Sequence, residues 1–273
     1  MSGKLIIVGT PIGNLGDFSP RGIDALKECD FIAAEDTRVT IKLLNRFDIK
    51  KPMISYYEHN RLARGELIVS RIGQGETCAL VSDAGMPAIS DPGEELVALC
   101  RQRGIAVSVI PGPSALISAL ALSGLPAGRF TFEGFLDINK KRREAHLASL
   151  AGEPRTMVFY EAPHKLRNTL ADMYGVFGDR RVSVAREITK LYEEVDLITL
   201  SGAVAKYSKT VPRGEFVLVV EGARDSEEQE YTLQEAVELA QKLKAGGMSA
   251  SKAAKEAAEV SGYRKSEIYA GLI

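Results

Sequence analysis

Three short segments have residue types that suit binding of a small molecule: two combine glycine and proline with a carboxylate, and one carries three charged side chains in a row of five residues. They are Thr10–Asp17, Ala34–Arg38 and Ser82–Gly93, and each follows an apolar run typical of a buried strand. In open α/β sheets, ligands bind at the loops that follow the carboxyl ends of the strands. Glycine and proline in Ser82–Gly93 would let a flat ligand lie against the backbone, while Asp83 and Asp91 offer acceptors to hydroxyl or amino groups.

Each of these carboxylates also has a purely structural interpretation. Asp91 is expected to be the N-cap of the helix that follows it, and Asp83 could close an Asx-turn. Glu35 and Asp36 stand beside Arg38 directly after a buried strand. These three charges form either a structural salt bridge or a group that orients a substrate.

Several common chemical motifs are incomplete in this sequence. Pro11 occupies the position of the second glycine in a dinucleotide fingerprint and supplies no N–H, so an NAD site is not expected. No glycine-rich phosphate loop is present, and Leu116 replaces the second glycine of a nucleophile elbow. The histidines have no His or Cys neighbour at ligand spacing, so no metal site is expected; they are His59, His146 and His164.

The first half of the chain alternates buried strands with amphipathic helices. This alternation predicts a parallel sheet with helices on both faces. Helices are expected to begin at Pro20 after the N-cap Ser19, at Thr37, after Asn60 and after Asp91. The expected strands are Leu5–Val8, Phe31–Ala34, Met53–Tyr56, Cys78–Val81 and Val107–Ile110.

The second half predicts a more mixed sheet, because the break near Thr189–Lys190 is too short for a helical crossover and favours an antiparallel pair. We therefore expect an α/β protein with two α/β domains, 1–112 and 113–222, and a tail over 223–273. The tail begins with an acidic linker, Asp225–Glu230, and continues as short helices capped by Ser249 and Ser266. The second-half strands are expected at Phe130–Leu136, Thr156–Tyr160, Val182–Ile188, Glu193–Leu200 and Phe216–Val220.

Composition limits the classes of partner. The 273 residues carry a net charge of −1 and suggest about two domains. From Tyr231 onward there are six basic and five acidic residues, which favours a helical cap or a dimer element over a DNA-binding module. The densest basic run, Lys140, Lys141, Arg142 and Arg143, is either a solvated helix face or a contact to phosphates.

Three further features of composition concern location. No apolar run reaches the roughly 18–20 residues of a membrane span. No signal peptide is recognised, and the cysteines are scattered, which favours a cytoplasmic protein with reduced thiols. The three cysteines are Cys29, Cys78 and Cys100.

Seven blocks, in this order, resemble the tetrapyrrole methylase-like family of class III S-adenosylmethionine methyltransferases. The resemblance extends over about residues 4–222. Within this family the blocks are similar to those of enzymes that methylate the 2′-hydroxyl of a cytidine ribose near the decoding centre of small-subunit ribosomal RNA. The blocks are Gly9–Leu15, Ala34–Arg38, Ser82–Gly93, Ile110–Ala115, Tyr160–His164, Ala185–Lys190 and Arg213–Val217.

The resemblance implies a fold and a set of partners. It implies two α/β domains with the methyl donor, S-adenosylmethionine, in the cleft between them and no metal. It also implies a homodimer that acts on small-subunit ribosomal RNA or on the assembled small subunit. Carried over to this sequence, the donor site would comprise Pro11, Asp83, Gly85, Met86, Pro87, Ser114, Ala115, Tyr160, Ala185 and Gly214. Ser114 is also a plausible helix N-cap, and Tyr160 a plausible core residue.

Methyl transfer to a ribose hydroxyl requires positioning and benefits from a proton acceptor, because the hydroxyl is a very weak acid. No spacing rule selects one acceptor. Arg38 and Arg186 would clamp phosphates. The candidate acceptors are Glu35, Asp36 and Glu187, together with Lys190 if its pKa is depressed.

Two other functions remain open from the sequence. The same fold could methylate a tetrapyrrole or corrin precursor, which would need an apolar cavity and no basic run. Alternatively, the chain could be a non-catalytic RNA-binding module, which should not bind the methyl donor.

Overall fold

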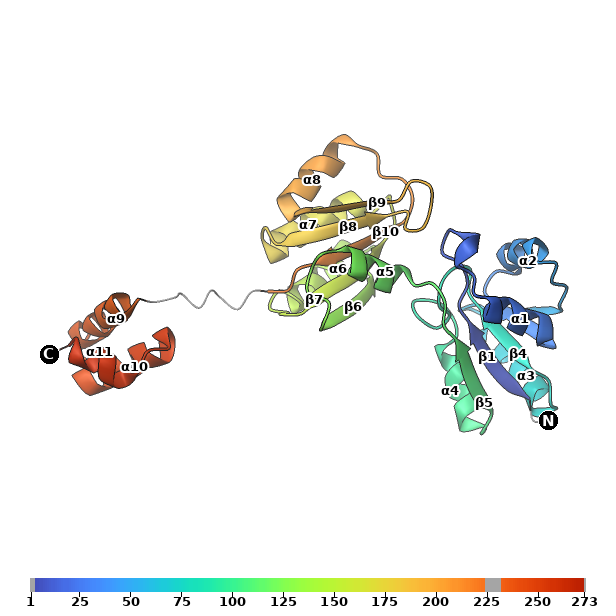
Figure 1. Cartoon of the computed structure of the whole chain (residues 1–273), viewed down its shortest axis with the longest axis horizontal. Helices are drawn as coiled ribbons and strands as arrows, with labels where there is room; N and C mark the ends of the chain where they lie inside the picture. Colours follow the sequence, from blue (N-terminus) through green and yellow to red (C-terminus); the bar gives the residue numbers. More distant parts are fainter. Residues whose placement is uncertain (1–2, 224–231, 273) are drawn as a thin grey trace. The chain divides into compact units, whose positions relative to one another are not determined.

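The computed structural model describes residues 3–223 and 232–272. The chain divides into two compact units, Met1–Glu221 and Gly222–Ile273. The first unit contains two five-stranded sheets with their helices (Figure 1). The second unit contains helices only within its described residues.

The first sheet is entirely parallel, as predicted, with strand order β3-β2-β4-β1-β5. Its strands are apolar because both faces are covered by helices. Side chains alternate between the faces: Leu5 packs with α3 and α4, whereas Ile6 packs with α1 and α2. The strands are β1 (Lys4–Val8), β2 (Phe31–Ala34), β3 (Met53–Ser55), β4 (Cys78–Val81) and β5 (Ala106–Ile110), and the helices are η1 (Leu15–Asp17), α1 (Pro20–Glu28), α2 (Thr37–Arg46), α3 (Arg61–Gly73) and α4 (Glu94–Gln102).

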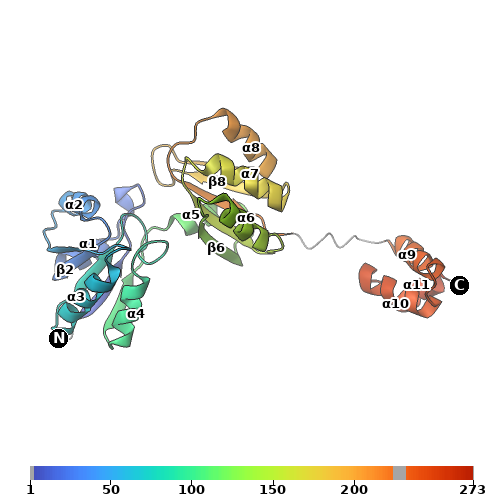
Figure 2. The ribbon, with the colours of Figure 1, turned by 180° about the vertical axis from the view of Figure 1, so that it is seen from behind.

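The second sheet is mixed, with strand order β6-β7-β10-β8-β9. Only β6 and β7 are parallel, and the predicted antiparallel pair is β8 with β9. One face packs on α6, α7 and α8 and the other on α5, and Figure 2 shows α6 and α7 over the same face. The strands are β6 (Phe130–Phe135), β7 (Thr156–Glu161), β8 (Arg181–Arg186), β9 (Glu194–Thr199) and β10 (Phe216–Val220), and the helices are α5 (Ala115–Leu122), α6 (Lys140–Ser149), α7 (Leu166–Phe177) and α8 (Leu200–Lys209).

The observed starts of the helices agree only in part with the starts predicted from the sequence. Ser19 caps α1, with Pro20 in its first turn, as predicted. The prediction that Asp91 caps the next helix is wrong: α4 begins three residues later, with Gly93 at the N-cap. Asn60 holds the N-cap position of α3, but its side chain bonds the preceding turn instead of the helix.

The second unit packs three helices, α9 (Leu233–Ala245), α10 (Ala250–Ser261) and α11 (Lys265–Ala270), around a small core of alanines and Ile268. Ser249 occupies the N-cap of α10 as predicted. Ser266 lies inside α11, whose N-cap is Arg264, so that prediction is wrong. The acidic linker Asp225–Glu230 lies outside the described residues. The division of the first unit into 1–112 and 113–222 stays a prediction.

Candidate active site

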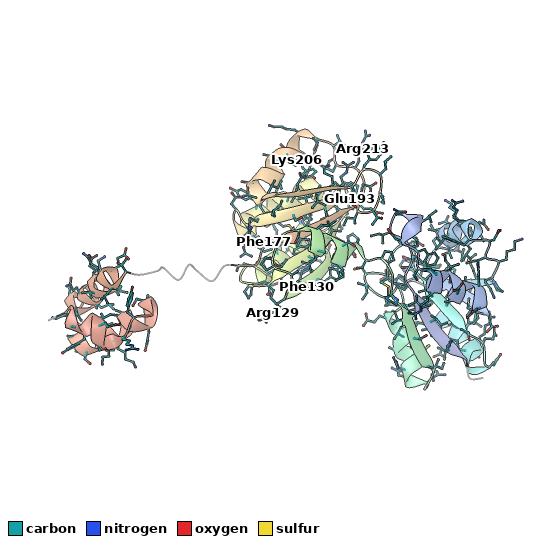
Figure 3. The ribbon with its side chains drawn as sticks, viewed as in Figure 1. Arg129, Phe130, Phe177, Glu193, Lys206 and Arg213 are labelled. Carbon is teal, nitrogen blue, oxygen red and sulfur yellow. The ribbon has the colours of Figure 1, made fainter. Side chains whose placement is uncertain are left out.

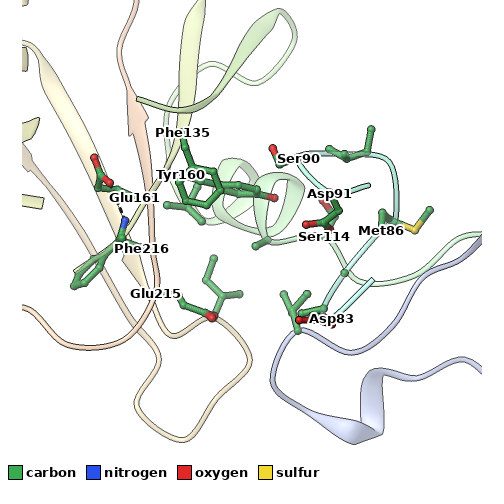
Figure 4. A pocket seen from close by; sticks show the side chains of 18 of the residues that line it. Asp83, Met86, Ser90, Asp91, Ser114, Phe135, Tyr160, Glu161, Glu215 and Phe216 are labelled. Carbon is green, nitrogen blue, oxygen red and sulfur yellow. Dashed lines mark hydrogen bonds between the residues drawn. The ribbon is translucent and has the colours of Figure 1, made fainter. Parts of the chain in front are cut away.

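A pocket of about 390 Å³ lies where the carboxyl ends of the first sheet face the second sheet (Figure 4). This volume is within the range of ordinary small-molecule sites. Loops after β1, β2, β4 and β5 supply one wall, and β6, β7, β10 and the segment after β8 supply the other. The pocket therefore has the position expected for ligands of parallel sheets.

The three central loops on the first-sheet side are joined through their backbones. Thr10 and Gly85 form an antiparallel bridge, with N···O distances of 2.8 and 3.1 Å. Gly9 and Gly112 touch so closely that a Cβ on Gly9 would lie 2.7 Å from the Gly112 Cα. Only glycine permits this approach, which holds the loops after β1, β4 and β5 in one fixed arrangement.

The loop between β4 and α4 carries backbone strain. Ala88 and Ser90 have φ of 68° and 63°, and Gly85 and Gly93 have φ of 83° and 148°. Non-glycine residues rarely adopt these angles, and such residues concentrate at ligand sites. A Cβ on Gly85 would lie 3.3 Å from the Ile12 side chain, so Gly85 leaves backbone exposed to the pocket.

Three carboxylates line this wall, and all three have raised pKa values. Burial raises the pKa of Asp91 to about 6, and the Glu35 carboxylate adds to the shift. Burial also raises the pKa of Glu35, with Asp83 contributing. Burial likewise raises the pKa of Asp83. Backbone bonds hold two of them: Asp83 N–H donates to Glu35 Oε2 at 3.4 Å, and Asp83 Oδ1 accepts the Asp36 N–H at 3.1 Å. Asp83 thus joins two loops and closes no Asx-turn of its own.

Asp36 has a different role from its neighbour Glu35. Its Oδ1 accepts the Arg38 N–H at 2.8 Å, which caps α2, and both its oxygens accept from the Arg38 guanidinium. The side-chain hydrogen bonds from Arg38 lower the pKa of Asp36 to about 2. A carboxylate with so low a pKa is a weak proton acceptor.

The opposite wall is aromatic and apolar. The Tyr160 ring packs against Phe132 and Phe135, with centroid distances of 5.0 and 5.4 Å. The Tyr160 hydroxyl accepts the Leu116 N–H at 3.2 Å, so Tyr160 both lines the pocket and satisfies the start of α5. Ser114 caps α5 and also lines the pocket, so both of its predicted roles are present.

The loop between β8 and β9 supports this second wall. Lys190 Nζ bonds Glu187 Oε1 and Glu215 Oε2, each at 2.9 Å. Burial lowers the pKa of Lys190, but its hydrogen bonds to Glu215 and Glu187 outweigh this effect and raise the pKa overall. The condition for Lys190 to act as a base is therefore not met. Gly13 lets the first-strand loop pack on Lys190, since a Cβ at Gly13 would lie 2.4 Å from the lysine Cγ.

The same loop is anchored on its outer side. Thr189 N–H donates to the Glu193 carboxylate at 2.6 Å, and Arg186 Nε donates to the Arg213 carbonyl at 2.7 Å. Figure 3 labels the two acceptor residues, Glu193 and Arg213. Arg186 also bonds Glu194 at 3.3 Å. Burial raises the pKa of Glu187, but hydrogen bonds from Lys190 and the Glu215 backbone outweigh it and lower the pKa overall.

Comparison with known proteins assigns this arrangement to a family. The family model described as Tetrapyrrole (Corrin/Porphyrin) Methylases matches residues 4–203. The chain belongs to the tetrapyrrole methylase family. This confirms the resemblance carried by the seven sequence blocks and makes the chain a methyltransferase.

Curated relatives within the family match nearly the whole chain. A protein of Synechocystis sp. named ribosomal RNA small subunit methyltransferase I is 45% identical over 268 residues, covering 98% of this chain and 96% of the relative. A protein of the same name from Thermotoga maritima is 50% identical over 220 residues, covering 81% of this chain and 99% of the relative.

A solved structure shows the same fold. Uroporphyrin-III C-methyltransferase from Thermus thermophilus, in complex with S-adenyl homocysteine, matches with a TM-score of 0.56 and 18% identity, covering 80% of this chain and 97% of that one. The tetrapyrrole methylase fold of two α/β halves, as predicted, is therefore present here.

Of the residues that the family resemblance assigned to donor or catalysis, several line the pocket and the others lie outside its lining, in loops or in strand β8. Pro11 and Pro87 neighbour lining residues in sequence, Ala185 pairs with Val217 in the sheet, and Gly214 (φ 86°) packs on Glu187. Asp36, Arg38, Glu187 and Lys190 are also outside the lining. The lining residues are Glu35, Asp83, Gly85, Met86, Ser114, Ala115 and Tyr160.

Sequence reasoning gave several pocket residues no individual role, although most of them lie within the seven blocks. Asp91 was offered both as an acceptor for ligand groups and as a helix cap, and the structure places it in the pocket lining. Glu161 lies within the Tyr160–His164 block, whereas Phe135 lies outside every block. Glu161 is buried, accepts the Ala162 N–H at 2.8 Å and lies 3.2 Å from Lys165. The Glu–Phe–Val part of the Arg213–Val217 block contained the signal for the remaining wall. The other lining residues that lie in the blocks but were given no individual role are Ile12, Ala84, Ile89, Ser90, Ala162, Pro163, Ile188, Glu215, Phe216 and Val217.

The basic run on α6 needs one correction. Arg143 is buried, with its Nε 2.7 Å from Asp172 and its Nη1 on two backbone carbonyls, so it anchors α6 and offers no charge to RNA. Lys140 and Arg142 are exposed and pair with Glu144 and Asp137 at 3.5 Å. Lys141 is exposed as well.

Two searches of the structure concern other classes of site. Within residues 3–223 and 232–272, no group of three His, Cys, Asp or Glu side chains has a metal-binding arrangement. Across the same described ranges, no helix is long and apolar enough to cross a membrane.

Proposed function

We propose that this protein transfers the methyl group of S-adenosylmethionine to the 2′-hydroxyl of a cytidine ribose near the decoding centre of small-subunit ribosomal RNA. The observation that carries the proposal is the set of relatives at 45–50% identity, matched over 96–99% of their own lengths, that are named ribosomal RNA small subunit methyltransferase I. A homodimer and a cytoplasmic location go with the proposal. The substrate is the ribosomal RNA or the assembled small subunit.

The pocket fits the methyl donor by its chemistry. An adenosine needs a groove with apolar walls and a few fixed polar groups, which Met86, Tyr160 and Ser114 supply. The exposed backbone at Gly85 lets a flat group lie close. The bound donor would supply a methyl group activated by a positively charged sulfur, and the carboxylates of Asp83 and Asp91 attract such a cation.

Among the candidate proton acceptors, Glu35 fits best. It lines the pocket, and burial together with the Asp83 carboxylate raises its pKa, so it holds a proton more readily than an ordinary glutamate. Asp36 already accepts hydrogen bonds from the Arg38 guanidinium and from the first turn of α2. Lys190 already donates to two carboxylates. Glu35 would orient the ribose hydroxyl and accept its proton.

The RNA lies outside this pocket in the proposal. Exposed Arg38, Lys140, Lys141 and Arg142 are the proposed phosphate contacts, with a lesser part for Arg186, whose guanidinium is already shared with Arg213 and Glu194. A macrocycle-methylating enzyme of the same fold would need no such basic residues at its surface.

The test is methylation of small subunits purified from cells that lack this protein, with the modified nucleotide mapped by mass spectrometry. We expect one 2′-O-methylcytidine per small subunit. Transfer to a base, to another ribose, or only to a tetrapyrrole would overturn the proposal. A protein that binds the RNA but takes up no donor in equilibrium dialysis would be the non-catalytic module.

The role of Glu35 is tested against the carboxylate beside it. Glu35→Gln should lower the single-turnover rate by about 10²-fold, the usual size of a general-base effect. Asp36→Asn is the matched control, because asparagine still caps α2 and the change removes one charge in the same loop. We expect Asp36→Asn to keep the rate within about threefold. A reversed order of effects would assign the proton to Asp36.

A further inference from the structure

The turn after β3 exposes two aromatic rings that the fold does not need. The segment Tyr57–Asn60, called here the Tyr57 turn, follows Tyr56, whose ring is buried in the core. Tyr57 is 42% exposed, and its ring meets the exposed His59 ring edge-to-face, with centroids 6.3 Å apart.

The backbone of the Tyr57 turn is fixed without help from these rings. Tyr57 N–H donates to Asn60 Oδ1 at 2.9 Å, and Asn60 N–H donates to the Tyr57 carbonyl at 3.0 Å. Asn60 Nδ2 also donates to the Ser55 carbonyl at 3.1 Å. The turn therefore presents Tyr57 in a preset position, and its exposure calls for another explanation.

The sheet register places the Tyr57 turn at the same edge as the pocket. Ser55 pairs with Ala34, and Ala34 pairs with Val81. Tyr57 and Asp83 each follow the aligned ends of β3 and β4 by two residues. Because one strand separates β3 from β4, the two positions lie about 10 Å apart across the sheet.

The two ends of this edge differ in the charges that they carry. The pocket end carries the carboxylates of Glu35, Asp83 and Asp91, which repel a phosphate backbone. Beyond Glu35 the edge carries Arg38, which is 88% exposed, and the exposed first turn of α3 with Arg64. The amino ends of α2 and α3 begin along this part of the edge.

Acidic groups are also present at the Arg38 end of this edge. Arg61 pairs with Glu95, and Asp36 with Arg38, while Glu58 is exposed in the turn. The arginines balance these carboxylates, so an RNA strand meets less repulsion here than at the pocket. A strand whose ribose enters the pocket has its neighbouring nucleotides along this edge.

We propose that the Tyr57 turn is a stacking site for an unpaired RNA base adjacent to the methylated nucleotide, with Tyr57 as the platform and His59 beside it. Single-stranded RNA is characteristically held by bases stacked on exposed Tyr and His rings. The proposal rests on the ribosomal RNA methyltransferase function. It adds a specific site for the base that flanks the target.

The test compares two exposed tyrosines of nearly equal exposure. Tyr57→Ala should weaken binding of small subunits purified from cells that lack this protein by roughly 5- to 100-fold, the range for loss of one stacked base. Tyr57→Phe keeps the ring and should bind like the wild type. Tyr174→Ala, at 44% exposure on α7, is the control and should leave binding unchanged. Melting temperature and donor affinity should match the wild type in all three.

Further readouts separate stacking from other roles. A stacking contact leaves the salt dependence of binding unchanged, whereas Arg38→Ala should flatten it by one phosphate contact. If Tyr57→Ala binds as tightly as the wild type, or if Tyr57→Phe loses affinity equally, the stacking proposal is overturned. If Tyr57→Ala only converts a dimer to a monomer, the turn is a contact between copies. If the wild type itself does not methylate or bind small subunits, the proposed function has failed instead.

Discussion

The carboxylates on the two sides of the pocket differ in the direction of their pKa shifts and in whether a lysine binds them. On the first-sheet side, Glu35, Asp83 and Asp91 have raised pKa values and no lysine or arginine among the lining residues beside them. On the second-sheet side, Glu215 lines the pocket and shares Lys190 with Glu187, which lies outside the lining and has a lowered pKa.

The difference indicates which wall takes part in chemistry. A carboxylate with a raised pKa can exchange protons or meet a cationic ligand near neutral pH. A carboxylate bound to a lysine has its charge compensated already and contributes mainly to the shape of the loop. We therefore propose that the first wall takes part in proton transfer and attracts the methyl donor, and that the second wall supports the pocket. Four experiments can break or sharpen this comparison.

The largest effect on donor affinity is expected from a larger side chain on the first wall. Gly85→Val places a branched side chain against Ile12 and into the pocket, so donor affinity should fall roughly 10- to 100-fold, as for typical overpacking. Gly104→Val is the control, because Gly104 has a similar φ of 68° and no atom within 4 Å of an added Cβ. Calorimetric titration with S-adenosylmethionine measures both. Unchanged affinity in a folded Gly85→Val protein would remove the donor from this wall.

A smaller effect is expected from pH. Asp91 is neutral below its pKa of about 6 and charged above it. Affinity for the cationic donor should therefore rise roughly 3- to 10-fold between pH 5 and pH 7.5, the size of one partly screened charge interaction. Asp91→Asn should flatten this rise. The uncharged sulfur of S-adenosylhomocysteine should give a weaker pH dependence.

The same residue predicts a change in stability. Its folded-state pKa lies above the unfolded value near 3.9, so its contribution is fully present below pH 4 and is lost as pH rises through about 6. Asp91→Asn should gain stability relative to the wild type at pH 7.5, by about 1 kcal/mol once partial exposure is allowed for. Equal stability of the two proteins at pH 4 and pH 7.5 would show that Asp91 keeps an ordinary pKa.

The smallest effect on binding is expected from the second wall. Lys190→Met leaves Glu187 and Glu215 without their shared cation and should lower the melting temperature by about 2–4 °C. Donor affinity should stay within about threefold. Lys206→Met is the matched control, because Lys206 bridges Glu194 and Asp196 outside the pocket lining. If only Lys190→Met loses donor affinity by tenfold or more, the second wall binds the donor directly.

Much of the fold was predictable from sequence because its signals are local. Each first-half strand is a short apolar run between turn residues, and the short break near Thr189–Lys190 correctly indicated the β8–β9 pair. The start of α4 was not predictable from the Asp91–Pro92 pattern. There the chain makes an extra turn with positive φ at Ala88, Ser90 and Gly93, angles outside the helical region, so the helix begins only at Glu94.

The site was harder to predict than the fold because its properties depend on distant partners. Arg143 belongs to a run of four basic residues, yet its side chain is buried and binds Asp172, which lies 29 positions further along the chain. The pKa of Lys190 depends on Glu215, 25 positions away. Glu35 and Asp36 are adjacent acidic residues whose environments differ in the folded chain. Asp36 binds Arg38, whereas Glu35 accepts the N–H of Asp83 from a neighbouring loop.

The order of strands in the second sheet has a consequence for synthesis on the ribosome. The first sheet is complete once Ile110 has left the exit tunnel, because all its strands precede that residue. The centre of the second sheet is β10, which is made last and pairs with both β7 and β8. Until Val220 emerges, the nascent chain holds two unpaired strand edges, which are sites of aggregation. Ribosomal pausing before residue 216 should therefore favour misfolding of the second sheet, whereas pausing after residue 110 should leave the first sheet intact.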